Sequence, residues 1–218
     1  MLKAILFDLD GTIINSIPLH DKSLRQIFAS LGVKISKQKI HAMLRLPTEE
    51  IYFKLGVKKK TGLNFQPFNS FKRNVYYGMI KGKDITLPGV EKALRALGKK
   101  YALAIVTNSS RKTVHASTPP QILNLFDAVV TYDDVRHGKP YPEPLRKALR
   151  KLGVKPKEAV FVGDSYYDAI ACNELNMRFF GVLTGVSTAK ELRDNGAWAV
   201  MKSAKELPKF LRKGIKPS

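Results

Sequence analysis

Two aspartates near the start of the chain, Asp8 and Asp10, directly follow the short apolar run Ala4-Ile5-Leu6-Phe7. Because side chains alternate along an extended chain, both carboxylates fall on the same side, and Leu9 turns to the other. Gly11 then allows the backbone to turn sharply beside them. Two carboxylates this close repel each other unless a cation lies between them or one keeps its proton. The pair therefore predicts either a site for a hard metal ion or a nucleophile with an acid/base partner.

Two later segments have the same form, an apolar run that ends in polar groups. Ile105-Val106 leads into Thr107-Asn108-Ser109, which offers a hydroxyl and backbone N–H groups to an oxyanion. Phe161-Val162 leads into Gly163-Asp164-Ser165, and Asp168 follows one helical turn later. The carboxyl ends of parallel strands lie along one edge of a sheet, and α/β proteins bind their ligands at that edge. We therefore expect these groups to meet Asp8 and Asp10 there.

Lys139 lies between these two segments, before a proline that restricts its backbone. A lysine, a hydroxyl and several carboxylates at one edge suit phosphoryl transfer to a carboxylate nucleophile. In this interpretation Asp8 attacks phosphorus, and Asp10 first protonates the leaving group and then deprotonates a water. Lys139, Thr107 and the N–H of Asn108 would stabilise the transferred group.

A divalent cation belongs to this interpretation, because Asp8 and a phosphate are both anions. Mg²⁺ prefers oxygen ligands and can bridge the two. We predict its ligands among four aspartates: Asp8, Asp10, Asp164 and Asp168. Asp8 and Asp164 are expected to bind the ion directly, and Asp168 either directly or through a water.

Apolar runs of strand length recur along the chain, and helical patterns separate most of them. The runs are Ala4–Phe7, Tyr101–Val106, Ala128–Val130, Ala159–Val162 and Phe179–Leu183. The helical patterns are Val90–Leu97, Pro144–Leu152 and Tyr167–Leu175. This alternation predicts an α/β protein, with a Rossmann-like parallel sheet and helices on both faces.

Residues 16–84 break the alternation, because they contain no comparable strand run. Two sets of apolar residues recur there at helical spacing: Leu24, Ile27, Phe28 and Leu31, then Phe68, Phe71, Val75 and Met79. We predict an all-helical cap domain at 16–84, inserted into a core domain that consists of residues 1–15 and 85–218.

Positive charge dominates the composition, with 38 Lys and Arg against 18 Asp and Glu and a net charge of +20. The basic residues are dispersed along the sequence, which favours a solvated surface that attracts small anions over a nucleic-acid site. A basic nucleic-acid-binding protein is the alternative. The single cysteine, Cys172, excludes an internal disulfide and is expected in the core.

No apolar run is long enough to span a bilayer, and the first residues do not resemble a signal peptide. We therefore expect no membrane partner and a cytoplasmic location. The protein is also expected to be a monomer or a homodimer.

Together, the four polar segments resemble the motifs of haloacid dehalogenase-superfamily phosphatases with a helical cap. Asp8-Leu-Asp10-Gly-Thr12 matches the first motif, Thr107-Asn108 the second, Lys139 the third, and Gly163-Asp164-Ser165 with Asp168 the fourth. The stretch from 138 to 185 is similar to phosphoglycolate-phosphatase-like and pyrophosphatase-like members. The resemblance implies the strand order 5-4-1-2-3. It also implies Mg²⁺-dependent hydrolysis of a small phosphorylated metabolite through an aspartyl-phosphate.

The predicted cap departs from the family pattern at Arg45-Leu46-Pro47, where relatives often have Gly-Leu-Pro. Arg45 either holds a second anionic group of the substrate or is solvated. His20 is either an acid/base or substrate contact carried by the cap, or a partly exposed histidine of its helix. Both are included with Asn108 as substrate-binding candidates. The alternative within this fold is a β-phosphoglucomutase-like phosphomutase that uses His20 and Arg73. Ser109 is expected to cap the helix that follows it.

Overall fold

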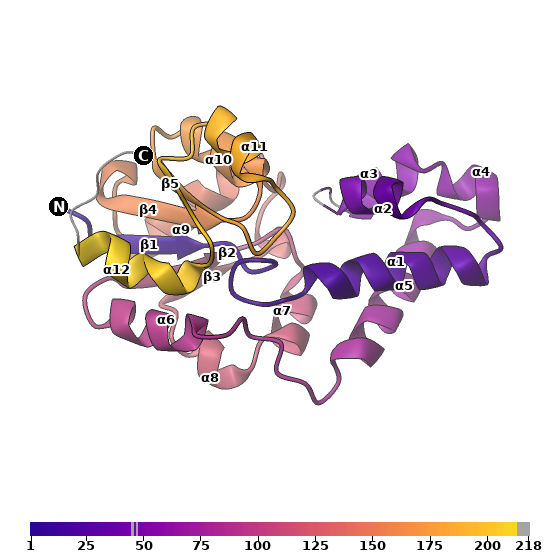
Figure 1. The fold of residues 1–218 in the computed structure, drawn as a ribbon, viewed down its shortest axis with the longest axis horizontal. Coiled ribbons are helices and arrows are strands. Elements are labelled where there is room, and N and C mark those ends of the chain that lie inside the picture. The colour runs from indigo at the N-terminus through magenta and orange to yellow at the C-terminus, as the bar shows by residue number, and fades with distance from the viewer. Residues whose placement is uncertain (45, 47, 213–218) are drawn as a thin grey trace. The chain divides into compact units, whose positions relative to one another are not determined.

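The structure, a computed structural model, describes residues 1–44, 46 and 48–212, and the chain divides into two compact units. The larger unit comprises Met1–Asn15 and Asp84–Ser218, and the smaller comprises Ser16–Lys83 (Figure 1). Asp84 belongs to the larger unit, one residue away from the predicted boundary. Its carboxylate accepts a hydrogen bond from the Thr86 N–H at 2.8 Å, and Thr86 in turn pairs with Ile14.

A six-stranded, wholly parallel sheet forms the centre of the larger unit. Its order is β3-β2-β1-β4-β5-β6. The strands are β1 (Ala4–Phe7), β2 (Ala102–Val106), β3 (Ala128–Val130), β4 (Ala159–Gly163), β5 (Arg178–Val182) and β6 (Ala199–Met201). The predicted α/β class is confirmed, and so is the order of the first five strands. The sequence analysis missed β6, although it identified β3, an edge strand of the same length.

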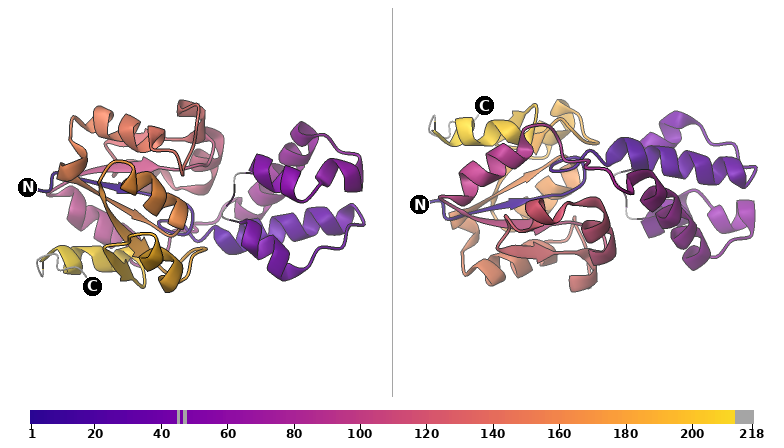
Figure 2. Two further views of the ribbon diagram at one scale, coloured as in Figure 1. Left: turned by 90° about the horizontal axis from the view of Figure 1, so that it is seen from above. Right: turned by 90° about the horizontal axis from the view of Figure 1, so that it is seen from below.

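Helices cover both faces of this sheet (Figure 2). They are α6 (Val90–Gly98), α7 (Arg111–Ser117), α8 (Pro120–Leu123), α9 (Glu143–Leu152), α10 (Tyr166–Asn173), α11 (Ala189–Asp194) and α12 (Leu207–Arg212). Single 3-10 turns occur at Tyr132–Asp134, Pro156–Glu158 and Ala204–Glu206. Along β1, Ile5 and Phe7 pack into one core with α6, whereas Ala4 and Leu6 pack into the other with α9. This alternation explains why the run is apolar at every position.

The central place of β1 positions the residues that follow it. Asp8 continues the strand, because its N–H donates to the Val162 carbonyl at 2.8 Å. Since β1 lies between β2 and β4, the polar segments that follow these three strands are neighbours.

The described residues of the smaller unit form helices joined by turns and loops, and no strand. It contains α1 (Ile17–Ser30), α2 (Lys37–Met43), α3 (Thr48–Lys54), α4 (Val57–Thr61) and α5 (Phe65–Ile80). Its own apolar core is centred on Phe68, which contacts Phe28 and Tyr52 with ring centroids 6.0 and 5.7 Å apart. None of the helices in the described part of the chain combines the length and apolar character that a bilayer crossing requires.

Because the two units have separate cores, we predict that a cavity made in the core of one unit destabilises that unit more than the other. Phe68→Ala removes a fully buried ring and should cost the helical unit about 3–5 kcal/mol. Hydrogen exchange should then accelerate in α1 and α5 while the protection of β1 and β4 is unchanged. Phe53, with 66% of its surface exposed, provides the matched control, and Phe53→Ala should change stability by less than about 0.5 kcal/mol. Equal loss of protection in the sheet would contradict separate cores.

Candidate active site

A buried lysine links two carboxylates beyond the end of β1. The ammonium of Lys139 lies 2.7 Å from Asp8 Oδ1 and 2.7 Å from Asp168 Oδ1. All three side chains are buried. Burial by itself would lower the pKa of Lys139, but the charges and hydrogen bonds of Asp168 and Asp8 raise it by more. The lysine therefore remains protonated and is held as a fixed positive charge.

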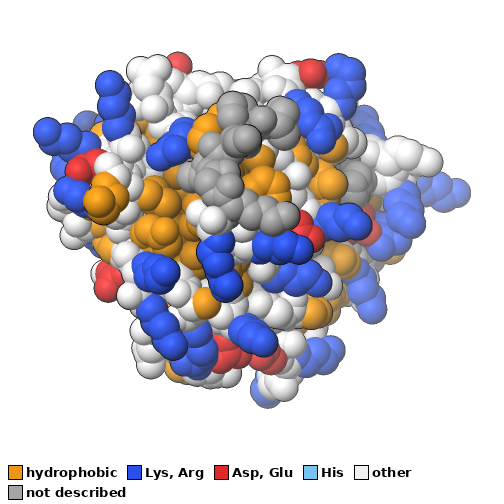
Figure 3. Space-filling model, turned by 60° about the vertical axis from the view of Figure 1, so that its left-hand side comes forward, with side chains coloured by type: hydrophobic (Ala, Val, Ile, Leu, Met, Phe, Trp, Pro, Cys, Tyr) orange, Lys and Arg blue, Asp and Glu red, His pale blue; other side chains and the backbone are white. Residues whose placement is uncertain are grey.

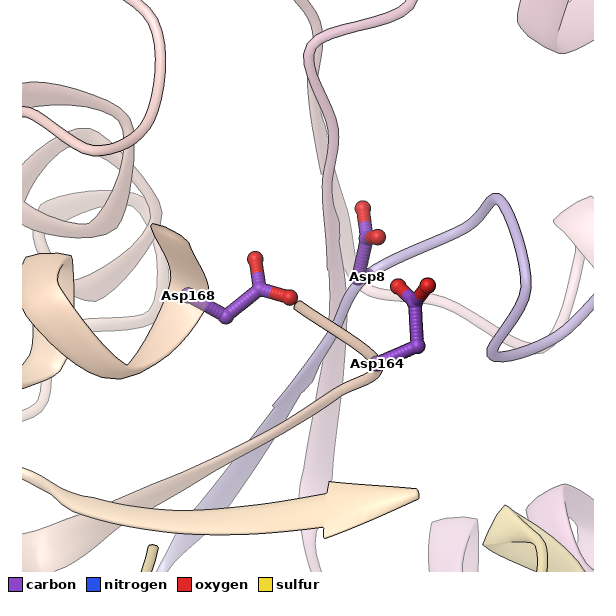
Figure 4. A group of neighbouring side chains, drawn as sticks. All are labelled: Asp8, Asp164 and Asp168. Atoms are coloured by element: carbon purple, nitrogen blue, oxygen red, sulfur yellow. The ribbon is translucent and has the colours of Figure 1, made fainter. Parts of the chain in front are cut away.

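Asp164 adds a third buried carboxylate. Ligand oxygens of Asp8, Asp164 and Asp168 all lie within 4.8 Å of one another (Figure 4). The pKa of Asp8 is raised from 3.8 to about 7 by all its surroundings together. Burial is the largest cause; the charge of Lys139 lowers the pKa, and the charges of Asp168 and Asp10 raise it. The pKa of Asp164 is also raised well above its usual value, by burial and then by the charges of Asp8 and Asp168.

This cluster fits a divalent cation. Three ionised carboxylates and one ammonium leave two uncompensated negative charges in a buried site, which a divalent ion would balance. The atoms that Asp8, Asp164 and Asp168 offer to a cation are carboxylate oxygens, the ligand type that Mg²⁺ prefers. Asp10, also predicted as a ligand, is not part of the group of three carboxylates found among the described residues.

Backbone groups of the loop after β5 hold Asp164 in place. The Val186 N–H donates to Asp164 Oδ2 at 2.8 Å, and the Ser187 N–H donates to the Asp164 carbonyl at 3.2 Å. A Cβ atom at Gly185 would lie only 1.7 Å from Asp164 Oδ2, so no larger residue fits without displacing the carboxylate. The sequence analysis assigned this loop no role in the site. The one sequence signal for such a role is the glycine at position 185, shortly after a predicted strand.

Asn108 holds the backbone of Lys139 from both sides. Its side chain donates to the Lys139 carbonyl and accepts from the Lys139 N–H, each at 2.8 Å. Gly138 allows this close approach, because a Cβ there would lie 2.5 Å from Asn108 Oδ1. The side chain of Asn108 thus positions the lysine, whereas its prediction as a substrate-binding residue rested on its N–H. Thr107 is buried beside it and accepts a hydrogen bond from the Ser109 N–H at 3.0 Å.

The prediction that Ser109 caps the next helix is wrong. Ser110 caps α7, since its Oγ accepts from the Thr113 N–H at 3.3 Å. The hydroxyl of Ser109 instead donates to Asp10 Oδ2 at 2.7 Å, which links the segment after β2 to the segment after β1. Two adjacent serines are equally good caps by residue type, so the sequence did not distinguish them.

Further residues named in the sequence analysis are His20, Arg45, Arg73 and Cys172. His20 belongs to α1 of the helical unit and stacks on Tyr76 with ring centroids 4.3 Å apart. Arg45 lies outside the described residues. Cys172 is fully buried in the core, as expected, and burial raises the pKa of its thiol well above the usual value. Arg73, the other residue of the phosphomutase alternative, belongs to α5 of the helical unit.

Comparison with known proteins gives consistent matches over most of the chain. The family model of haloacid dehalogenase-like hydrolases matches residues 5–182. Pyrophosphatase PpaX from Bacillus velezensis is 33% identical over 193 residues, which cover 87% of this chain and 87% of the relative.

Solved structures with the same fold include a hydrolase from Pseudomonas syringae, with a TM-score of 0.85 and 22% identity, covering 99% of this chain and 100% of the other. A protein assigned as a phosphoglycolate phosphatase from Lactobacillus plantarum has a TM-score of 0.80 and 22% identity, covering 96% and 99%. The resemblance to the haloacid dehalogenase-like hydrolases is therefore confirmed by the family model and by the relative from Bacillus velezensis, and the solved structures share the fold.

The contact between Gly185 and Asp164 leads to a prediction about cation binding. Gly185→Ala should displace the carboxylate and weaken Mg²⁺ binding by about tenfold or more, as measured by calorimetric titration. Gly98→Ala is the control in the same unit, because a Cβ there meets only Leu103 Cδ1 at the ordinary distance of 3.5 Å. If both variants bound Mg²⁺ like the wild type, the loop after β5 would have no part in the cation site.

Proposed function

Since the chain belongs to the haloacid dehalogenase-like hydrolase family and is a phosphatase, we propose that it hydrolyses a small phosphorylated compound through a phosphate bound covalently to Asp8. The observation that carries this proposal is the buried pair of Asp8 and Lys139 at the ligand-binding edge of the sheet. An ammonium at this position orients the carboxylate and stabilises the negative charge of a transferred phosphoryl group.

The proposed reaction has two halves. Asp8 attacks phosphorus and displaces the leaving-group oxygen, which takes a proton from Asp10. A water then attacks the phosphate on Asp8, Asp10 accepts the water's proton, and inorganic phosphate is released. Thr107 and the N–H of Asn108 are proposed to bind phosphate oxygens during both halves.

Asp8, Asp164 and Asp168 are the residues proposed to hold Mg²⁺, since their oxygens and uncompensated charge fit a divalent ion. When bound, the ion supplies positive charge that allows an anionic phosphate to approach an anionic carboxylate. Asp164 contributes a fixed ligand, because the backbone after β5 already orients its carboxylate.

The substrate is proposed to be a small anion. The relative from Bacillus velezensis is named a pyrophosphatase, and a structural neighbour is assigned as a phosphoglycolate phosphatase, so pyrophosphate and phosphoglycolate are the first compounds to test. Lys and Arg side chains are scattered over the face shown in Figure 3 and are interrupted by apolar and uncharged groups. On this face the basic side chains form no continuous track for a nucleic acid, and such a distribution supports attraction of small anions.

The decisive test is the substitution of the nucleophile. Asp8→Asn keeps the shape of the side chain but cannot attack phosphorus, so phosphate release should fall by about a thousandfold or more. Asp194→Asn is the control. The carboxylate of Asp194 is exposed, and among the described residues its hydrogen-bond partner is Lys190. Phosphate release should be measured with pyrophosphate, phosphoglycolate and hexose phosphates.

Two outcomes would contradict the proposal. One is substantial phosphate release by Asp8→Asn at unchanged thermal stability. The other is interconversion of hexose 1- and 6-phosphates without phosphate release by the wild type, which would indicate the phosphomutase alternative.

Cation binding should depend on pH, because a cation must displace the proton that Asp8 holds below about pH 7. Mg²⁺ affinity should therefore fall about tenfold for each pH unit below that value and level off above it. The raised pKa of Asp164 acts in the same direction. Calorimetric titrations in two buffers with different ionisation enthalpies would count the protons released. Asp8→Asn should release fewer protons, and an affinity independent of pH would contradict the proposed ligand set.

A further inference from the structure

Asp10 receives a hydrogen bond from a residue that lies 99 positions further along the chain. The hydroxyl of Ser109 donates to Asp10 Oδ2 at 2.7 Å. Building on the function proposed above, we propose that Ser109 is a positioning residue for Asp10, which fixes the carboxyl group that exchanges protons with the leaving group and with water.

The backbone of Ser109 is itself held at both ends, so its hydroxyl has a defined position. Its N–H donates to Thr107 Oγ1 at 3.0 Å, and its carbonyl accepts from the Tyr132 N–H at 3.1 Å. The neighbouring Ser110 caps α7, so capping does not require the Ser109 side chain. Asp10 is also restrained, because its backbone pairs with Ile14 and the Gly11 N–H donates to the Ile14 carbonyl at 2.9 Å.

This contact fixes the orientation of the Asp10 carboxyl group, because the hydroxyl of Ser109 holds its Oδ2. In the first half-reaction the bond between an Asp8 oxygen and phosphorus forms, the bond from phosphorus to the leaving oxygen breaks, and the proton of Asp10 moves to that oxygen. In the second, a bond between the water oxygen and phosphorus forms, the bond between Asp8 and phosphorus breaks, and the water's proton returns to Asp10. Both halves balance in atoms and charge without a further reactant.

The importance of a proton donor depends on the leaving group. An alkoxide is a poor leaving group and needs protonation as it departs, whereas p-nitrophenolate leaves readily without it. Misplacing Asp10 should therefore slow hydrolysis of an alkyl phosphate much more than hydrolysis of p-nitrophenyl phosphate. A merely structural role for Ser109 would slow both reactions equally. The comparison uses kcat/KM, which reports steps up to the first bond cleavage.

The experiment compares ethyl phosphate with p-nitrophenyl phosphate for the wild type and three variants, with thermal unfolding as a check on folding. Ser109→Ala should lower kcat/KM for ethyl phosphate by about tenfold or more, and for p-nitrophenyl phosphate by less than about threefold. Ser109→Thr keeps a hydroxyl on the same β-carbon and should retain a ratio close to that of the wild type. Ser110→Ala is the matched control, since it loses the cap of α7 but not the contact with Asp10, and it should leave the ratio unchanged.

An equal loss with both substrates, or no loss with either, would overturn the positioning role of Ser109 while leaving the proposed function intact. Activity of Asp8→Asn with both substrates would instead remove the proposed function, and the role of Ser109 with it. The same set of assays therefore distinguishes the two failures.

Discussion

The sharing of one buried ammonium between Asp8 and Asp168 is the constraint on which the rest of the site depends. A buried charge is tolerated only where a partner of opposite sign lies close to it, and Lys139 has two such partners. The reverse holds for the carboxylates, since burial and mutual repulsion raise the pKa of Asp8 and of Asp164 despite the lysine. The cluster thus remains short of positive charge. A site short of positive charge at the ligand-binding edge of a sheet is one that attracts a cation and, through it, an anionic substrate.

Hydrogen bonds to main-chain groups keep the charged residues of this cluster in position. Asn108 clamps the main chain of Lys139, and the main chain of Val186 holds Asp164. Gly138 and Gly185 are the positions at which these contacts leave no room for a side chain. Such contacts hold Lys139 and Asp164 through main-chain hydrogen bonds, which position a charged group more firmly than its own flexible side chain could. The parallel sheet supplies that rigidity, since every residue of β1 is completely buried.

The site residues that could be predicted from the sequence are those recognised by their own type and by the residues directly before them in the chain. The apolar run before Asp8 indicates a buried strand by itself, and the carboxylates, the lysine and the hydroxyl follow strands in a way that parallel topology brings together. Contacts between distant segments could not be predicted in this way. Nothing local shows that Gly185 must face Asp164, or that Ser109 must reach Asp10 while Ser110 caps the helix. Length alone does not explain why β6 was missed, because β3 is an edge strand of the same length and was predicted.

Asp8 and Asp10 show how two identical side chains, two residues apart, come to occupy different environments. Asp8 is buried and faces an ammonium and two further carboxylates. Asp10 is only half-buried, lies outside that group of carboxylates, and accepts a hydrogen bond from a neutral hydroxyl. A carboxylate beside a fixed positive charge is suited to act as a nucleophile toward an anion, whereas one held by a neutral donor is suited to exchange a proton. The roles proposed for the two residues, nucleophile for Asp8 and acid/base for Asp10, are consistent with these surroundings, which the alternation of the strand and the turn at Gly11 bring about.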